Sequence, residues 1–370
     1  MPQAKRPAET PAPTVSRVLL YAEQNYAYAI LRPLQTAVRA RGGEACWFLA
    51  GDEINPAWLR DDEIRLPTVD AVRAWQPEAV LAPGNMVPDF IPGLKVAVFH
   101  GFNVAKATRS DDRGHFNIRG CFDLYCTQGP NTTTGFEERA ARHGYFRVAE
   151  TGWPALDPLF RPEADPQASM PALPAPDGRP TVLLCSTFTR NLSCAPHLLD
   201  TVRQLRDTGR WQWLVQFHPK MDPAVVEAYK ALQNEHLTYV ETDNVLPLLR
   251  RADVMVCDTS SVMLMFIVQR KPVVTFRNQS QGRHDHLIDI TDPGLLENSI
   301  AEALTRPDAL MQKIDSYIAA LHPYRDGRAS ERVLAAIDAH SAEGAANVQP
   351  RPRNILRNMK QRAKMKFWKI

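Results

Sequence analysis

The chain has 370 residues and a formal net charge of +3 at pH 7, and its hydrophobic fraction of 44% and charged fraction of 23% are typical of a soluble globular protein. A length of roughly 150 residues per domain predicts two domains. No apolar run approaches the ~20 residues that span a bilayer, and the six cysteines form no Cys-x-x-Cys pair. We therefore expect a protein of the reducing cytoplasm with no transmembrane helix and no metal site.

The first part of the chain is expected to be a leader followed by an α/β domain. Residues 1–16 are rich in proline and lack the apolar core of a secretory signal, which predicts a disordered leader. From residue 17, short apolar runs such as RVLLYAE and KVAVFHG alternate with helical patterns at 24–40 and 132–142. This alternation predicts a parallel sheet with helices on both faces over residues 17–160.

A proline-rich stretch separates this domain from a second α/β series. Residues 161–180 contain six prolines and almost no large apolar residue, which predicts an interdomain linker. Residues 181–345 repeat the alternation, from TVLLCST through WLVQFHP and DVMVCDTS to helical patterns at 295–305, 308–321 and 328–341. Two Rossmann-like domains whose parallel sheets face a central cleft form the GT-B architecture, which is the α/β fold that we expect.

The last segment, 346–370, is basic and amphipathic. The final twenty residues hold eight Lys and Arg and no Asp or Glu, and removing these eight charges from the net +3 leaves −5 on the rest of the chain. An acidic body with a basic tail argues against a nucleic-acid partner. The apolar residues of the tail have helical spacing: Ile355, Leu356, Met359, Ala363, Phe367 and Ile370, with Trp368 nearby. We expect residues 351–370 to lie on an anionic membrane surface, and the alternative is a solvated basic tail.

Two histidines end strand-like runs, one in each expected domain. His100 follows VAVF, and His218 follows WLVQF. Ligands of open α/β proteins bind beyond the carboxyl ends of the strands, so both imidazoles are expected to face a site. Gly101 permits a tight turn that would leave His100 facing the cleft, where it can remove a proton from an acceptor hydroxyl. Lys106 and Arg109 follow and can hold an anionic acceptor.

The second domain carries candidate groups for a phosphorylated donor. Lys220, two residues after His218, can neutralise a diphosphate together with the imidazole. The turn after the apolar run VMVC contains Asp258, Ser260 and Ser261, and it precedes an apolar helix. Ser and Asp are preferred N-caps, and the free amides of such a helix end bind anions. A capping role without any ligand is the simpler interpretation of the turn alone.

Two further patterns lie nearer the end of the chain. Asp326-Gly327 precedes a helical pattern and is explained as a helix entry, whereas nearby arginines such as Arg332 suggest phosphate binding. His284 and His286 are close enough to bind a metal, but no third ligand stands at a suitable spacing. The chain has no G-x-S-x-G, P-loop or G-x-G-x-x-G motif, which argues against hydrolase, ATPase and dinucleotide functions.

Taken together, the order and spacing of these segments resemble the CDP-glycerol glycerophosphotransferase family, which builds poly(glycerol phosphate) polymers including teichoic acids. The resemblance covers roughly residues 95–340. It rests on the following residues: His100-Gly101 with Lys106; Thr151, Gly152, Pro154 and Asp157 in ETGWPALDPLF; Thr187 and Arg190 in VLLCSTFTR; His218-Pro219; the run ADVMVCDTSSVMLMF; and Asp326, Gly327 and Arg332 in DGRASER.

The resemblance implies a GT-B transferase that moves glycerol phosphate, or a related alditol phosphate, from a CDP-activated donor to a hydroxyl of a glycan or lipid-linked acceptor. CMP leaves, and no cofactor or divalent metal is needed. His100 and His218 would be the catalytic residues, with His100 as general base. The donor would contact Thr187, Arg190, Lys220, Asp258, Ser260, Ser261, Asp326, Gly327 and Arg332. The acceptor would contact Gly101, Lys106 and Arg109.

The resemblance also implies a place in the cell. Enzymes of this type make teichoic acid or capsule polysaccharide, so we expect a cytoplasmic protein that is peripheral on the inner face of the membrane.

Two other interpretations stay open. The first is a GT-B glycosyltransferase that uses a nucleotide sugar, or a relative of UDP-N-acetylglucosamine 2-epimerase. The glutamate pair with which those enzymes grip the nucleotide ribose is not evident after Asp258, which favours the phosphotransferase. The second is a non-catalytic nucleotide-binding subunit that docks on a membrane through its tail. The presence of both His100 and His218 argues against this second interpretation.

Overall fold

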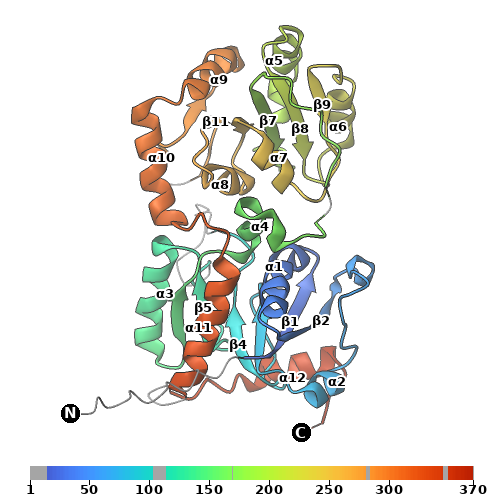
Figure 1. Ribbon diagram of the computed structural model, residues 1–370, viewed down its shortest axis with the longest axis vertical. Helices are drawn as coiled ribbons and strands as arrows, with labels where there is room; N and C mark the ends of the chain where they lie inside the picture. The colour runs from blue at the N-terminus through green and yellow to red at the C-terminus, as the bar shows by residue number, and fades with distance from the viewer. Residues whose placement is uncertain (1–14, 103–113, 169, 281–283, 345–348, 370) are drawn as a thin grey trace, which may run out of the picture.

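The computed structural model describes residues 15–102, 114–168, 170–280, 284–344 and 349–369. These residues form two α/β bodies stacked along the long axis of the molecule, each built on a six-stranded sheet with helices on its faces (Figure 1). Most strand residues are buried, which is the pattern of a parallel sheet covered by helices on both sides. The predicted α/β class with two parallel sheets is therefore confirmed.

The first sheet has the strand order β2-β1-β3-β4-β5-β6, and all neighbouring strands are parallel. Its strands are β1 (Arg17–Gln24), β2 (Glu44–Glu53), β3 (Ala79–Ala82), β4 (Leu94–Ala97), β5 (Leu124–Thr127) and β6 (Arg147–Glu150). Its connecting helices are α1 (Tyr26–Ala40), α2 (Val69–Trp75) and α3 (Pro130–His143). Since β1, β3 and β4 are neighbours, the residues that follow them meet at one edge of the sheet.

The second sheet has the order β12-β11-β10-β7-β8-β9 and is also parallel. Its strands are β7 (Thr181–Ser186), β8 (Gln212–Phe217), β9 (Leu237–Tyr239), β10 (Val254–Cys257), β11 (Val273–Phe276) and β12 (Ile288–Ile290). Its helices are α5 (Ala195–Asp207), α6 (Pro223–Lys230), α7 (Leu246–Arg251), α8 (Val262–Ile267), α9 (Leu296–Thr305) and α10 (Asp308–Leu321). The strands β10, β7 and β8 are adjacent, so their carboxyl ends also meet.

The chain passes between the two bodies twice. The first passage runs from β6 through the short helices η3 (Pro154–Leu156) and α4 (Asp157–Phe160) and the proline-rich stretch 161–180 to β7. The second runs from the end of α10 into α11 (Ala329–Glu343), which lies beside the first sheet (Figure 1).

The second passage corrects the predicted domain ranges. Residues 181–345 were expected to form the second domain, but α11 packs against α1 and β5 of the first body. Its buried residues Val333, Leu334 and Ile337 belong to the same apolar core as Val38 of α1. The helical pattern at 328–341 shows an apolar face, but it carries no information on which of two sheets will cover that face.

One apolar core is continuous through both bodies. It contains Leu20 of the first sheet, Leu183 of the second sheet, and the connecting residues Leu156 and Leu159, all of which are buried. Burial of an aliphatic side chain of this size contributes about 1.5–3 kcal/mol. The first passage is therefore a packed part of the molecule at Leu156 and Leu159.

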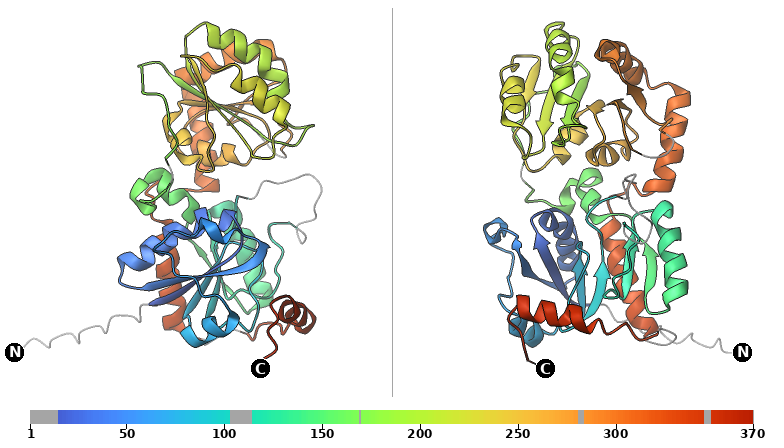
Figure 2. Two further views of the ribbon diagram at one scale, coloured as in Figure 1. Left: turned by 90° about the vertical axis from the view of Figure 1, so that its right-hand side faces the viewer. Right: turned by 180° about the vertical axis from the view of Figure 1, so that it is seen from behind.

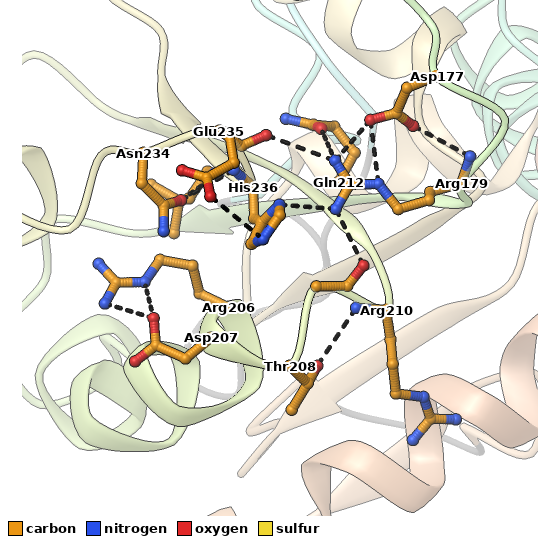
Figure 3. A network of polar contacts seen from close by, with 12 residues as sticks. Asp177, Arg179, Arg206, Asp207, Thr208, Arg210, Gln212, Asn234, Glu235 and His236 are labelled. Atoms are coloured by element: carbon orange, nitrogen blue, oxygen red, sulfur yellow. Dashed lines mark hydrogen bonds and ion pairs between the residues drawn. The ribbon is translucent and has the colours of Figure 1, made fainter.

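Arg179 fastens the end of the proline-rich stretch to the second sheet (Figure 3). Its guanidinium donates hydrogen bonds to the Asp177 carboxylate at 2.5 Å, to Oε1 of Gln212 at 3.0 Å and to the carbonyl oxygen of Gly209 at 2.9 Å, and it lies 2.7 Å from Nδ1 of His236. Gln212 begins β8, and His236 precedes β9. This network lies at the amino ends of the strands, away from both candidate histidines, and its role is structural.

The tail forms a helix on the first body. Helix α12 (Ile355–Lys364) lies across the end of this body near α2 (Figure 1), and the right-hand view of Figure 2 shows it lengthwise from behind. Phe367, just after the helix, is buried against Phe90, with ring centroids 5.2 Å apart, and Lys369 pairs with Asp70 at 2.9 Å. In the part of the chain that the structure describes, no helix has the length and apolar character needed to cross a membrane.

Candidate active site

A pocket of about 570 Å³ lies at the carboxyl ends of the strands of the first sheet. Its lining includes Glu23 and Gln24 at the end of β1, Glu53 at the end of β2, Gly84 after β3 and His100 after β4. Groups far apart in the sequence meet here because these strands are neighbours in the sheet. The structure therefore places His100 in a pocket, and its catalytic role stays a prediction.

The turn after β4 has its unusual residue at Phe99. Phe99 has φ +58°, in the left-handed region that bulky residues seldom adopt. The φ of Gly101, by contrast, is not positive, and a Cβ at this position would meet nothing within 4 Å. The turn therefore does not use the conformational freedom that Gly101 was expected to supply, although His100 does line a pocket. Backbone strain of this kind occurs often at functional sites, and here it directly precedes His100.

The hydrogen bond of His100 defines its tautomer. Nδ1 of His100 lies 3.3 Å from the carbonyl oxygen of Pro83. A carbonyl oxygen only accepts, so Nδ1 carries a hydrogen, and in the neutral ring Nε2 presents its lone pair. The ring also lies beside Tyr26, with centroids 5.6 Å apart. In this tautomer Nε2 of His100 can take a proton from a hydroxyl group.

His218 has the opposite tautomer at the end of β8. Its Nδ1 accepts a hydrogen bond of 3.0 Å from the backbone N–H of Lys220, so the neutral ring carries its hydrogen at Nε2. Partial burial, and then the charge of Lys220, lower the pKa of His218, which favours the neutral ring. The exposed ring lies 4.5 Å, between centroids, from that of Phe188. His218 is therefore arranged to donate a hydrogen bond from Nε2.

Asp258 is fully buried at the end of β10. Its carboxylate accepts hydrogen bonds from the Ser186 hydroxyl at 2.6 Å, from the Thr187 N–H at 3.1 Å and from the Cys194 N–H at 2.9 Å. The sequence assigned Asp258 to donor binding, whereas these bonds use the carboxylate to fix the loop between β7 and α5. Asp258 is therefore a positioning residue for this loop, which carries Arg190.

Ser260 and Ser261 lie between β10 and α8. Ser261 is the N-cap residue, but its backbone is helical (φ −67°, ψ −21°) and its side chain makes no hydrogen bond to the helix. The predicted capping role is therefore wrong for Ser261, which is exposed. The adjacent carboxyl ends of β10, β7 and β8 bring together six of the predicted donor or catalytic residues: Thr187, Arg190, His218, Lys220, Ser260 and Ser261.

Three predicted donor residues lie beside the end of β6 instead. Nε of Arg332 donates to the carbonyl oxygen of Thr151 at 2.8 Å, and its other nitrogens donate to the Asp326 carboxylate at 2.8 and 3.0 Å. Gly327 has φ +65°, and a Cβ there would lie 2.7 Å from that of Arg161. Arg332 and Asp326 thus bind each other, and Gly327 permits close packing. Their contact with a donor stays a prediction.

Two other predicted groups are the acceptor-binding cations and the pair of neighbouring histidines. Lys106 and Arg109, the predicted acceptor-binding cations, lie outside the described residues. The imidazoles of His284 and His286 lie 6.1 Å apart between centroids, and His286 stacks on Tyr317 at 3.7 Å. Within the described ranges, no group of three or more His, Cys, Asp and Glu is arranged to hold a metal ion.

Comparison with known families identifies the chain. Residues 105–339, more than half of the chain, match the family described as CDP-Glycerol:Poly(glycerophosphate) glycerophosphotransferase. The chain belongs to this family. It is therefore an enzyme of the CDP-glycerol glycerophosphotransferase class, as the resemblance indicated, although the match begins after His100. No curated protein sequence matches it.

Solved structures share the fold of this glycerophosphotransferase at low sequence identity. A putative UDP-N-acetylglucosamine 2-epimerase from Listeria monocytogenes is 17% identical, with a TM-score of 0.59 over 92% of this chain and 99% of that chain. The wall teichoic acid polymerase TagF is 16% identical, with a TM-score of 0.60 over 89% of each chain. The S. aureus MnaA–UDP co-structure is 14% identical, with a TM-score of 0.56 over 91% and 99%. These likenesses confirm the GT-B fold.

Three cations of the His100 pocket were not predicted from the sequence: Arg119, Arg357 and Lys364. Arg119 precedes β5, and the other two belong to α12. The helical spacing of the tail could have predicted that two of them lie together, because Arg357 and Lys364 are seven residues apart and therefore lie on one helix face. Nothing in that spacing shows that this face lies against a pocket of the first body.

Proposed function

We propose that this glycerophosphotransferase moves glycerol phosphate from CDP-glycerol to a hydroxyl of a glycan or lipid-linked acceptor and releases CMP. The observation that carries the proposal is the pair of opposite tautomers. His100 presents a lone pair at Nε2, and His218 presents an N–H at Nε2. Transfer of a phosphoryl group to an alcohol uses one group of each kind, a proton acceptor at the nucleophile and a hydrogen-bond donor at the phosphate.

In the proposed reaction, the acceptor oxygen attacks the glycerol-bearing phosphorus of the donor. A new P–O bond forms, the bond from that phosphorus to the oxygen shared with the cytidylyl phosphate breaks, and CMP leaves with the electron pair. The hydroxyl proton passes to Nε2 of His100. The transition state carries its charge on the phosphate oxygens, and His218, Lys220 and Arg190 supply the donor and cations that stabilise this charge.

We also propose that the product is a cell-surface polymer made at the inner face of the membrane. TagF, which shares the fold, is described as a wall teichoic acid polymerase, and its variant structures include CDPG soaks. A capsule polysaccharide is the other polymer of this chemistry, and a CDP-alditol such as CDP-ribitol is the second donor to test.

Helix α12 supports a position at the membrane. Its apolar residues Ile355, Leu356 and Met359 and the nearby Trp368 are between 52% and 79% exposed. The same twenty-residue tail holds eight cations and no acidic residue. An apolar helix face flanked by cations fits the headgroup region of an anionic membrane, in which the side chains lose contact with water and the cations stay near phosphate.

The test of the reaction is CMP release from CDP-glycerol with a glycerol-phosphate-primed acceptor. We expect acceptor-dependent release by the wild-type protein, and we expect His100→Ala and His218→Ala each to lower kcat by about 10²–10⁴-fold. His197→Ala is the control, because this exposed histidine belongs to α5 and its ring lies 5.8 Å, between centroids, from that of Phe276. Wild-type protein that releases no CMP and binds a UDP-sugar tightly would move the assignment to the glycosyltransferases.

A further inference from the structure

The pocket that contains His100 has an acidic wall and a basic wall. The acidic wall comes from the ends of two neighbouring strands and contains Glu23, Asp52 and Glu53. The basic wall contains Arg119 and, from helix α12, Arg357 and Lys364. Arg357 donates a hydrogen bond to the backbone carbonyl of Arg119, so the basic wall is a connected unit.

The two cations of α12 span the pocket. Arg357 and Lys364 are two turns apart, about 10 Å along the helix axis, and they point to the same side of the helix. Lys364 has no ion-pair partner among the described residues, and Arg357 uses one nitrogen on a carbonyl oxygen. Burial raises the pKa of Glu23, and the charge of Lys364 opposes this rise across the pocket. The basic wall therefore retains charge for a ligand.

Helix α12 has a defined position on the first body. The Asn358 amide donates to the Asp89 carboxylate, and the Asp89 N–H donates to Oδ1 of Asn358 at 3.2 Å. The Asn354 amide donates to the carbonyl oxygen of Gly120 at 3.0 Å. Arg362 lies over the ring of Phe90, 4.9 Å from its centroid. These contacts use the polar face of α12 and hold it against the pocket.

We propose that α12 is part of the acceptor site, where Arg357 and Lys364 bind the phosphate of the acceptor chain end while its free hydroxyl lies at His100. The proposal rests on the proposed function and assigns substrate-positioning residues to a segment outside the matched range 105–339. A polyol phosphate end fits the two walls, because its phosphate pairs with cations and its hydroxyls donate to carboxylates. The apolar face of the same helix would hold this pocket beside the membrane that carries a lipid-linked acceptor.

The test compares Arg357→Gln, Lys364→Gln and the double variant with wild type, using CDP-glycerol and a short soluble oligo(glycerol phosphate) acceptor. A charge-assisted hydrogen bond to phosphate corresponds to about a tenfold change in affinity. We expect acceptor KM to rise about tenfold in each single variant and more in the double variant, with kcat and donor KM within about twofold of wild type. Arg357→Lys, which keeps the charge, should recover most of the affinity.

The matched control is Arg353→Gln with Lys360→Gln, which removes the same charges from exposed positions of the tail. We expect its acceptor KM to stay within about twofold of wild type. An equal rise in acceptor KM in the control would overturn the proposal, because the effect would then be a general one of tail charge. A rise in donor KM alone, or unchanged constants in the double variant, would also overturn it. A wild-type enzyme that releases no CMP with any acceptor would instead count against the proposed function.

Discussion

His322, at the end of α10, is a buried neutral imidazole that joins the two bodies. It is 2% exposed, and its Nε2 accepts a hydrogen bond of 2.9 Å from the backbone N–H of Trp153. Burial lowers the pKa of His322 to about 4, below the value of about 6.5 in an unfolded chain. Between these two values the unfolded state binds more protons, so the free energy of unfolding falls as the pH falls from about 6.5 to 4.

This contribution can be measured with a side chain that accepts the same hydrogen bond and does not titrate. We expect His322→Gln to lose less stability than wild type between pH 7 and pH 4, with a difference of about 3 kcal/mol at pH 4. Urea unfolding at several pH values measures it. Identical pH dependence in the two proteins would show that His322 does not lose its hydrogen bond by protonation.

Single residues also show where the sequence predicts a site and where it does not. The strand-end rule placed His100 and His218 at strand ends, and the structure has them there. The same rule placed Asp258 in the donor site, yet its carboxylate points into the loop after β7. The position of a residue at a strand end indicates where its Cα lies. The direction of its side chain also depends on which loops lie beside it, and the sequence alone does not show which loops these are. The left-handed backbone of Phe99 has no sequence signal at all, because bulky residues rarely adopt it.

Among the elements, α12 is unusual because it turns its polar side to the protein and its apolar side outward. We expect Leu356→Glu with Met359→Glu to weaken binding to anionic vesicles by at least tenfold, since each change removes apolar area and adds a repelled charge. Vesicle co-sedimentation measures this. The control is Ile64→Glu, at an apolar residue that is 61% exposed elsewhere on the first body.

The two variants should keep CMP release with a soluble acceptor, because the changed residues face away from the pocket. Equal vesicle binding by wild type and the α12 variant would exclude this helix as the membrane contact. Binding that is equally strong to neutral vesicles would show that the cations of the tail contribute little.

Elements with clear periodicity were predicted well, and short or isolated ones were not. The patterns at 295–305 and 308–321 correspond to α9 and α10, whose apolar faces repeat over ten and fourteen residues. Strand β12 has three residues, too few for any pattern to stand out, and it was missed. Periodicity also predicted α11 as a helix while leaving its partner sheet undefined.

At the scale of the whole molecule, Asp157 ties the two passages between the bodies to each other. Its carboxylate accepts hydrogen bonds from the N–H of Ala329 at 2.8 Å and from the N–H of Ser330 at 2.7 Å, in the first turn of α11. Without the carboxylate both buried amides lose their partner, which costs about 1–3 kcal/mol for each group. We expect Asp157→Ala to lower the free energy of unfolding by about 2–4 kcal/mol, whereas Asp200→Ala, at an exposed ion pair, should change it by less than about 0.5 kcal/mol.

Urea unfolding followed by tryptophan fluorescence tests this coupling, because the seven tryptophans include Trp47 in the first sheet and Trp213 in the second, so the signal reports on both bodies. Asp157 acts on α11, while Leu156 and Leu159 still join the two sheets through one core. The fluorescence of Asp157→Ala should therefore change in a single transition, at a lower urea concentration than in wild type. Two separate transitions in the variant would mean that the bonds from Asp157 to α11, and not the shared core, make the two bodies unfold together. A midpoint equal to that of Asp200→Ala would mean that the two bonds from Asp157 do not contribute to the stability of α11, whose other contacts include the bond from Arg332 to Thr151.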